Sequence, residues 1–76
     1  MNDTRRKALK KLANQLEDIR AEIEALKDEE QEYRDNMPEN LQGSERYEAS
    51  EEADGNMDEA IEYLYSAIES VESAAE

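Results

Sequence analysis

Apolar positions recur at alternating steps of three and four residues along the first half of the chain. Hydrophobic residues that return every 3.5 residues form the seam of a coiled coil. We therefore predict a first helix over about residues 4–36, capped at its start by Asn2 or Asp3. It stops before Pro38, because proline disfavours helical backbone in the residue that precedes it. The predicted seam is Leu9, Leu12, Leu16, Ile19, Ile23, Leu26, Glu30, Tyr33 and Met37.

The second half of the chain carries a similar pattern. Ser44 is a good N-cap and predicts a second helix over about residues 45–75, which leaves residues 37–44 as a linker. Gly55 lies within this helix at a cost of about 1 kcal/mol relative to alanine. We expect one helix that continues through Gly55, with or without a bend; a fresh start capped by Asn56 is the alternative. The predicted seam is Tyr47, Ser50, Asp54, Met57, Ile61, Leu64, Ile68, Val71 and Ala75.

Two helices of similar length joined by a short linker predict an all-α fold, an antiparallel two-helix coiled-coil hairpin. A register centred on residue 40 of the linker pairs the two seams along their whole length. It places Ile23 opposite Met57 and Leu16 opposite Leu64.

The predicted seam becomes polar toward the linker, where Glu30 faces Ser50 and Leu26 faces Asp54. A polar residue at a seam position specifies alignment at a cost in stability, so these residues are candidates for a register lock. The alternative is that the second helix rotates or frays ahead of Gly55, so that these groups reach water. We expect fraying, because glycine provides a weak point in the helix.

A second apolar column overlaps the first on the second helix. The combined apolar arc is about 140° wide, with Tyr63 and Tyr65 at its borders, and one partner helix covers less than that. A core this small also seldom outweighs the entropy of ordering the chain. We therefore predict a homodimer, a four-helix bundle in which second helix packs on second helix. A lone hairpin whose alanines only favour helix is the alternative. The predicted dimer interface is Ala53, Met57, Ala60, Leu64, Ala67, Val71 and Ala74.

Composition changes this picture in one respect. The chain has 22 acidic and 9 basic residues, and Leu, Ile and Val number only 11 of 76. That combination is typical of disorder. Ala, Glu, Lys, Leu and Arg make up 41 of 76 residues, however, which is typical of long helices when a helical period accompanies it. The period favours helices, and disorder until a partner binds is the alternative.

The residue types that are missing exclude most chemistry. The chain has no histidine and no cysteine, so imidazole bases, thiol nucleophiles and zinc sites built from them are excluded. We predict no catalytic, cofactor-binding or metal-binding residues, and a protein that is not an enzyme. No run reaches 18 apolar residues and no apolar segment follows the N-terminal bases, so we expect a cytoplasmic protein without membrane contact.

Charge is unevenly distributed along the chain. Residues 1–11 carry five bases and one acid, whereas residues 12–76 carry four bases and 21 acids. The hairpin brings the N-terminal bases beside Glu69, Glu72 and Glu76, so we expect the charges to neutralise one another within the molecule. Direct nucleic-acid binding is not expected, because phosphate contacts require a net basic surface.

Two classes of protein partner fit this surface. An adaptor would bind its partner through the second helix or the linker tip, with Leu41, Tyr63 and Tyr65 as candidate contacts. Leu41 has a structural alternative, in which it closes the end of the hairpin beside Met37 and Tyr47. An inhibitor would instead present carboxylates that imitate nucleic acid to the groove of a basic protein, with strongly salt-dependent binding. The candidate carboxylates are Glu48, Glu51, Glu52, Asp58, Glu59 and Glu62.

The segment from Tyr33 to Tyr47, which contains NMPENLQ, resembles the linker of short acidic proteins from gut-type bacteria and their phages and mobile elements. In that group a leading Lys/Glu-rich helix and a trailing Ala/Glu-rich helix flank the linker. The group has no assigned activity, so the resemblance implies no functional residues. It implies a bacterial or phage accessory protein, and the inhibitor would then be phage-borne and directed at a host defence or DNA-processing protein.

Overall fold

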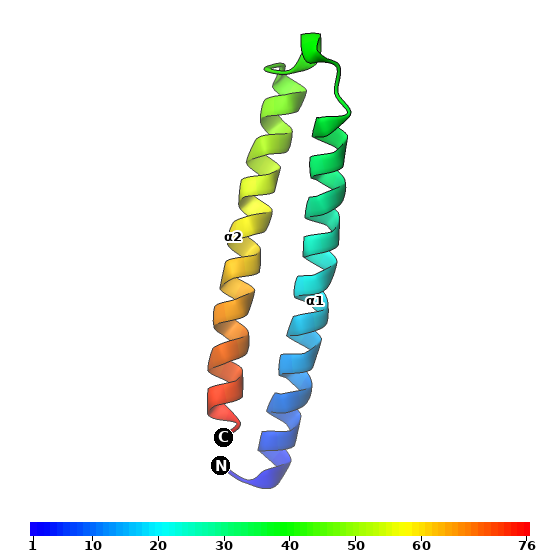
Figure 1. The fold of residues 1–76 in the computed structure, drawn as a ribbon. Helices are drawn as coiled ribbons and strands as arrows, with labels where there is room; N and C mark the ends of the chain where they lie inside the picture. The colour runs from blue at the N-terminus through cyan, green and yellow to red at the C-terminus, as the bar shows by residue number, and fades with distance from the viewer.

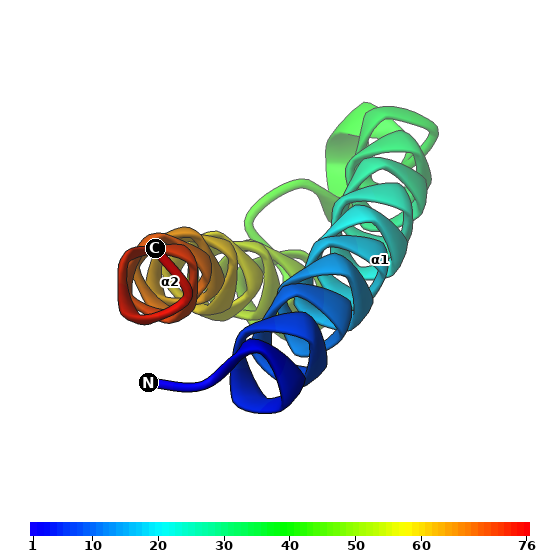
Figure 2. The same cartoon turned by 90° about the horizontal axis from the view of Figure 1, so that it is seen from below.

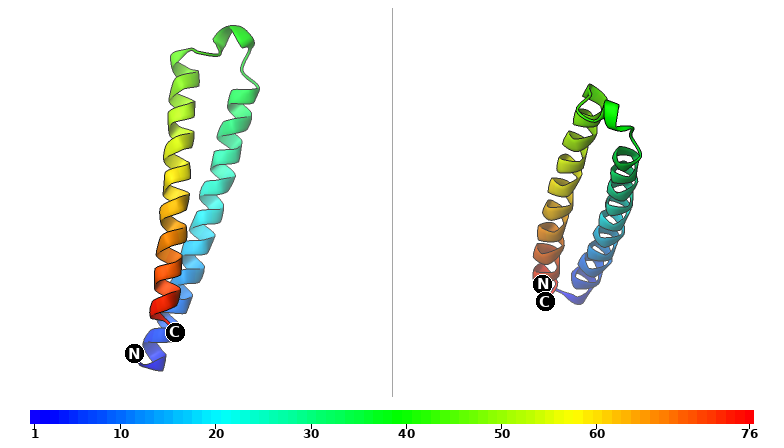
Figure 3. Two further views of the ribbon diagram at one scale, coloured as in Figure 1. Left: turned by 60° about the vertical axis from the view of Figure 1, so that its left-hand side comes forward. Right: turned by 45° about the horizontal axis from the view of Figure 1, so that its top comes forward.

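The chain folds as two long helices packed against each other, as predicted. The structure is a computed structural model that describes all 76 residues. Helix α1 spans Asp3–Asp35, helix α2 spans Glu45–Ala74, and a short 3₁₀ helix, η1, spans Glu39–Leu41 between them. The helices run antiparallel and bring both termini to one end (Figures 1 and 3). The result is a rod of 60 × 14 × 12 Å.

Side-chain oxygens cap the start of both helices. The Asn2 side chain accepts a hydrogen bond from the backbone N–H of Arg5 at 2.8 Å. The Ser44 hydroxyl accepts one from the backbone N–H of Tyr47 at 3.4 Å. Each bond satisfies one of the amide groups that have no partner within the first helical turn. Of the two predicted caps for the first helix, Asn2 is therefore the residue used.

The linker reverses the chain through backbone hydrogen bonds alone. The Leu41 N–H donates to the Pro38 carbonyl at 2.9 Å, and the Ser44 N–H donates to the Leu41 carbonyl at 3.1 Å. Gly43 has a φ of 90°, a left-handed conformation that side-chain-bearing residues rarely adopt. A glycine at this position therefore lets the chain enter α2 directly at Ser44.

Helix α2 is continuous through Gly55, so the expected fraying ahead of this residue does not occur. No residue of its predicted seam is exposed, and Ile61 and Ile68 are almost completely covered. Ser50, which fraying would have left in water, is only 3% exposed. The seam predicted for the second helix is the surface that α1 covers.

The seam predicted for the first helix is only half right. Its alternate members face α2, namely Leu9, Leu16, Ile23, Glu30 and Met37. The members between them are 45–57% exposed, namely Leu12, Ile19, Leu26 and Tyr33. In their place, α1 turns toward α2 the residues that directly follow them in the sequence, namely Ala13, Arg20, Lys27 and Arg34. This corresponds to a rotation of the helix by roughly 50° at 100° per residue.

The rotation follows from the polar residues in the α2 seam. Ser50 and Asp54 need hydrogen-bond donors or cations once they are covered, because an unpaired buried polar group is costly. Leu26 and Glu30, their predicted partners, supply neither. Lys27 and Arg34 supply both.

The core that results is small. The covered hydrophobic residues are Ala13, Ile61, Ile68 and Ala75, and no large side chain is fully buried. Figure 2, which looks along the hairpin from its open end, shows two helices side by side with no third element on either flank. Most apolar side chains are therefore covered on one side only.

Candidate interaction surfaces

A polar cluster joins the two helices near the linker. One Arg34 nitrogen, Nη1, donates to the Ser50 carbonyl at 3.1 Å and to its hydroxyl at 3.2 Å. The other, Nη2, lies 3.5 Å from Asp54 Oδ2. Lys27 Nζ lies 3.5 Å from Asp54 and 3.3 Å from Asp58. The cluster therefore matches two cations with two carboxylates and fixes which turns of the helices face each other.

The pKa of Lys27 depends on the carboxylates of this cluster. Contact with the Asp58 carboxylate raises the pKa of Lys27 above its ordinary value, and the negative charge of Asp54 adds to the effect although partial desolvation opposes it. Of the predicted partner-binding carboxylates, Asp58 is thus engaged within the hairpin.

Arg20 forms a second polar contact between the helices. Its guanidinium lies 4.8 Å from the centre of the Tyr65 ring, in cation–π geometry. It also donates to Glu24 at 2.8 Å, and this hydrogen bond raises the pKa of Arg20 further above its ordinary range. Tyr65, predicted as a partner contact, therefore has one ring face occupied by its own chain.

Tyr63 points away from the hairpin. Its ring is 67% exposed, the largest value among the big hydrophobic side chains. Its hydroxyl donates to Glu59 one helical turn away at 2.9 Å. Nothing from α1 covers it, so it remains available to another molecule.

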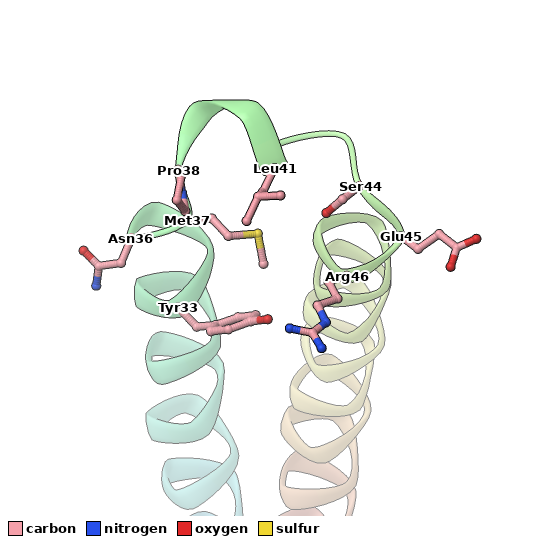
Figure 4. A pocket seen from close by; sticks show the side chains of 8 residues that line it. All are labelled: Tyr33, Asn36, Met37, Pro38, Leu41, Ser44, Glu45 and Arg46. Atoms are coloured by element: carbon pink, nitrogen blue, oxygen red, sulfur yellow. The ribbon is translucent and has the colours of Figure 1, made fainter.

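An open hollow of about 620 Å³ lies at the linker end, between the two helices. Leu41 and Met37 point into it from above, and Tyr33 and Arg46 flank it from α1 and α2 (Figure 4). Leu41 is 45% exposed, so it covers the end of the hairpin only in part. Tyr47, its expected neighbour, does not line the hollow. The remaining lining residues are Asn36, Pro38, Ser44 and Glu45.

The predicted dimer interface is incompletely covered by α1. All of its members are half-buried except Ala74, which is exposed. Three of its members belong both to the predicted seam of α2 and to the predicted dimer interface, and they face α1 in part, namely Met57, Leu64 and Val71. The alanines lie on the flank of the contact between the helices.

The carboxylates of α2 form an outer surface. Asp58 is paired with Lys27. The other predicted ones are exposed and take part in no ion pair, namely Glu48, Glu51, Glu52, Glu59 and Glu62. They are free to meet a basic partner.

The N-terminal bases are not neutralised as expected. Arg6 pairs with Asp3 at 3.0 Å, and its Nε donates to the backbone carbonyl of Glu76 at 3.2 Å. Neither Glu69 nor Glu72 forms an ion pair with any base. The other four bases of this end also have no ionic partner, namely Arg5, Lys7, Lys10 and Lys11. The basic and the acidic side chain of each expected pair both stay in water, where an ion pair contributes little to stability.

The residues that sequence reasoning missed are Arg20, Lys27 and Arg34. Their spacing of seven contains the signal, since each directly follows a predicted seam residue of the first helix. A column of bases next to a polar partner seam predicts ion pairs between the helices. The hollow shared by Tyr33 and Arg46 was not indicated by either seam alone.

Comparisons with protein-family models, curated proteins and solved structures find no match to this chain. The structure contains no group of three or more side chains placed to hold a metal ion. Neither helix has a stretch apolar and long enough to cross a bilayer.

Proposed function

We propose that this protein is a non-enzymatic protein–protein interaction module, a cytoplasmic dimeric hairpin that acts as a bacterial or phage accessory adaptor. The observation that carries the proposal is the hollow at the linker end. Met37 and Leu41 point into it, and the Tyr33 ring flanks it with 45% exposure. Apolar concavities of this kind are where binding energy concentrates in protein interfaces.

The chemistry of the hollow defines the partner that it fits. Its apolar side chains are Met37, Leu41 and the Tyr33 ring, and the Arg46 guanidinium lies toward that ring from α2, whereas the Glu45 carboxylate points away (Figure 4). A partner that inserts one apolar side chain and offers a carboxylate to Arg46 would satisfy both parts. No cofactor enters this proposal, and the bacterial or phage origin rests on the resemblance of the linker.

A pair of variants tests this use of the linker end. Met37→Ser combined with Leu41→Ser removes the apolar lining, whereas Asn40→Ser combined with Gln42→Ser changes exposed linker residues that do not line the hollow. Proteins captured from a bacterial lysate by the unaltered chain should be lost with the first variant and kept with the second. Circular dichroism checks that both variants remain helical. Equal capture by the two variants would contradict the proposal.

A second candidate function is the phage-borne inhibitor that imitates nucleic acid. Five of the six predicted carboxylates take part in no ion pair, and this favours it, because charged groups already paired within the hairpin could not serve. Glu51→Lys combined with Glu59→Lys should then abolish capture of a basic nucleic-acid enzyme, and 0.5 M salt should do the same. Capture that survives both changes favours the adaptor.

The dimer belongs to the same proposal. A hairpin with four covered hydrophobic residues and no fully buried large side chain has little to hold it together alone. Association through the alanine column of α2 would cover apolar surface that α1 leaves open.

A further inference from the structure

One side of the hairpin carries an apolar column from each helix. On α1 the column is Leu12, Ile19, Leu26 and Tyr33, and on α2 it is Ala53, Ala60, Ala67 and Ala74, with Arg46 at the same heptad position one step nearer the linker. Residues seven apart stay on nearly the same side of a helix. At the linker ends of the two columns, Tyr33 and Arg46 both line the linker-end hollow and a second hollow, which is completed by Glu30, Ala49 and Ser50. The columns therefore flank one surface, which we call the apolar face.

The opposite side of the hairpin is polar. Glu24, Lys27 and Asp58 line a separate hollow there. Asp58 lies about 60° to one side of the buried Ile61, whereas Ala60 lies about 100° to the other side, at 100° per residue. The ion pairs and the apolar face therefore lie on opposite flanks of the contact between the helices.

The exposed surface of this rod is large enough for a second copy to cover part of it. The chain exposes 5752 Å², whereas a compact monomer of 8.8 kDa is expected to expose about 4800 Å². Two chains that each covered the surplus of roughly 1000 Å² would bury about 2000 Å² in total, the size of a stable, specific interface. A second copy of the chain is large enough to do this.

We propose that two copies pack apolar face to apolar face about a two-fold axis parallel to the hairpin, so that α1 of each copy lies on α2 of the other. This deepens the proposed function and rests on its dimer. The other symmetric stacking, with the axis across the hairpin, would place α1 on α1 and α2 on α2.

Side-chain size favours the mixed arrangement. The α1 column consists of leucine, isoleucine and tyrosine, and the α2 column consists mainly of alanine. Large side chains packed against small ones interdigitate, whereas alanine facing alanine leaves room and leucine facing leucine pushes the helices apart. Leu26 of one copy would lie over Ala60 of the other, and Ile19 over Ala67.

Charge favours the same arrangement. Helix α1 carries eight bases and ten acids, whereas α2 carries one base and ten acids. Packing α2 on α2 would bring the two most acidic helices together. The mixed arrangement separates them and places the unpaired bases of residues 5–11 beside the acidic end of the partner's α2. Arg5 continues the α1 column at this end.

Mass measurements on matched variants test the dimer. Sedimentation of the full chain at micromolar concentration should give twice 8.8 kDa. Leu26→Glu places a charge on the apolar face and should weaken association by about 100-fold or more. Gln31→Glu adds the same charge on the opposite flank of α1 and should leave the mass unchanged. A folded species of 8.8 kDa, or equal masses for both variants, would overturn the proposal.

Disulfide cross-linking tests the arrangement, because the chain has no cysteine of its own. Chains with Leu26→Cys, mixed with tagged chains with Ala60→Cys and oxidised, should form the mixed disulfide. A dimer that lacks this product while Ile19→Cys chains link to each other would show α1 on α1 and refute the mixed packing. Capture by the linker-end hollow is read separately, so its failure is distinguishable from failure of the dimer geometry.

Discussion

Arg34 shows how a single side chain selects the packing of the hairpin. It is 9% exposed, and its guanidinium satisfies the Ser50 carbonyl and hydroxyl while approaching Asp54. A leucine would pack as well against the aliphatic part of α2 but would leave the Ser50 hydroxyl without this donor and Asp54 with Lys27 as its only cation. The register of the hairpin near the linker therefore depends on polar matching more than on apolar area.

Arg34→Met tests this role. The substitution keeps an unbranched apolar stem and removes the guanidinium donors, so we expect the free energy of unfolding to fall by about 2 kcal/mol. Lys11→Met, which removes an exposed base without a partner, should change it by less than about 0.5 kcal/mol. Urea denaturation followed by circular dichroism gives both values. Similar losses for the two variants would mean that the cluster does not hold the register.

Lys27 makes stability depend on alkaline pH. A lysine whose pKa is raised by folding stabilises the folded state fully below its unfolded pKa of about 10.4, and this contribution is lost as pH rises through the folded pKa. We therefore expect Tm to fall as pH rises above about 10.4, and to fall less in Lys27→Gln. All other titratable groups are present in both chains, so the difference isolates Lys27. If the curves of Tm against pH were parallel for the two chains, Lys27 would not contribute to the pH dependence of stability.

The sequence predicts the elements of the fold better than their contact faces. Polar caps at Asn2 and Ser44 and the stop at Pro38 are local signals, and the helices follow them. The face that α1 turns to α2 is not a local property. Helix α1 has two neighbouring columns that could face α2. The more apolar column is left exposed, because the polar residues of the α2 seam require the bases of the other column.

The same reasoning explains what was missed in the candidate site. A single chain does not reveal whether an apolar column faces its own second helix or another molecule. The α1 column from Leu12 to Tyr33 was therefore assigned to the inside of the hairpin. Helix α2 also has two overlapping columns, but both of its isoleucines belong to the predicted seam, and they are buried against α1.

The two glycines predict opposite responses to alanine. Gly55 lies inside α2 with open space around an added Cβ, so Gly55→Ala should stabilise the chain by about 0.5–1 kcal/mol. Gly43 has a positive φ, so Gly43→Ala should destabilise it by about 1 kcal/mol despite equal space. Denaturant titration of both variants measures the difference. Destabilisation by Gly55→Ala would indicate that α2 needs to bend there.

At the scale of the whole molecule, a thin rod holds a net charge of −13. Most of the excess lies along α2, where exposed carboxylates repel one another. The ion pairs that oppose this repulsion are few, and those of Arg34 and Lys27 are partly shielded from salt by their burial. Added salt therefore screens the repulsion more than the attraction.

We accordingly expect Tm to rise by about 5 °C when sodium chloride increases from 0.02 to 0.5 M, which corresponds to about 1 kcal/mol for a chain of this size. Replacing Glu51, Glu52 and Glu59 by glutamine lowers the net charge from −13 to −10 and should reduce the response to salt. Differential scanning calorimetry at fixed protein concentration measures both chains. A Tm that falls with salt would mean that ion pairs, and not apolar contacts, hold the rod together. In that case ion pairs would also have to hold the two copies together, because the apolar face alone would not keep the interface stable once salt had screened the ion pairs.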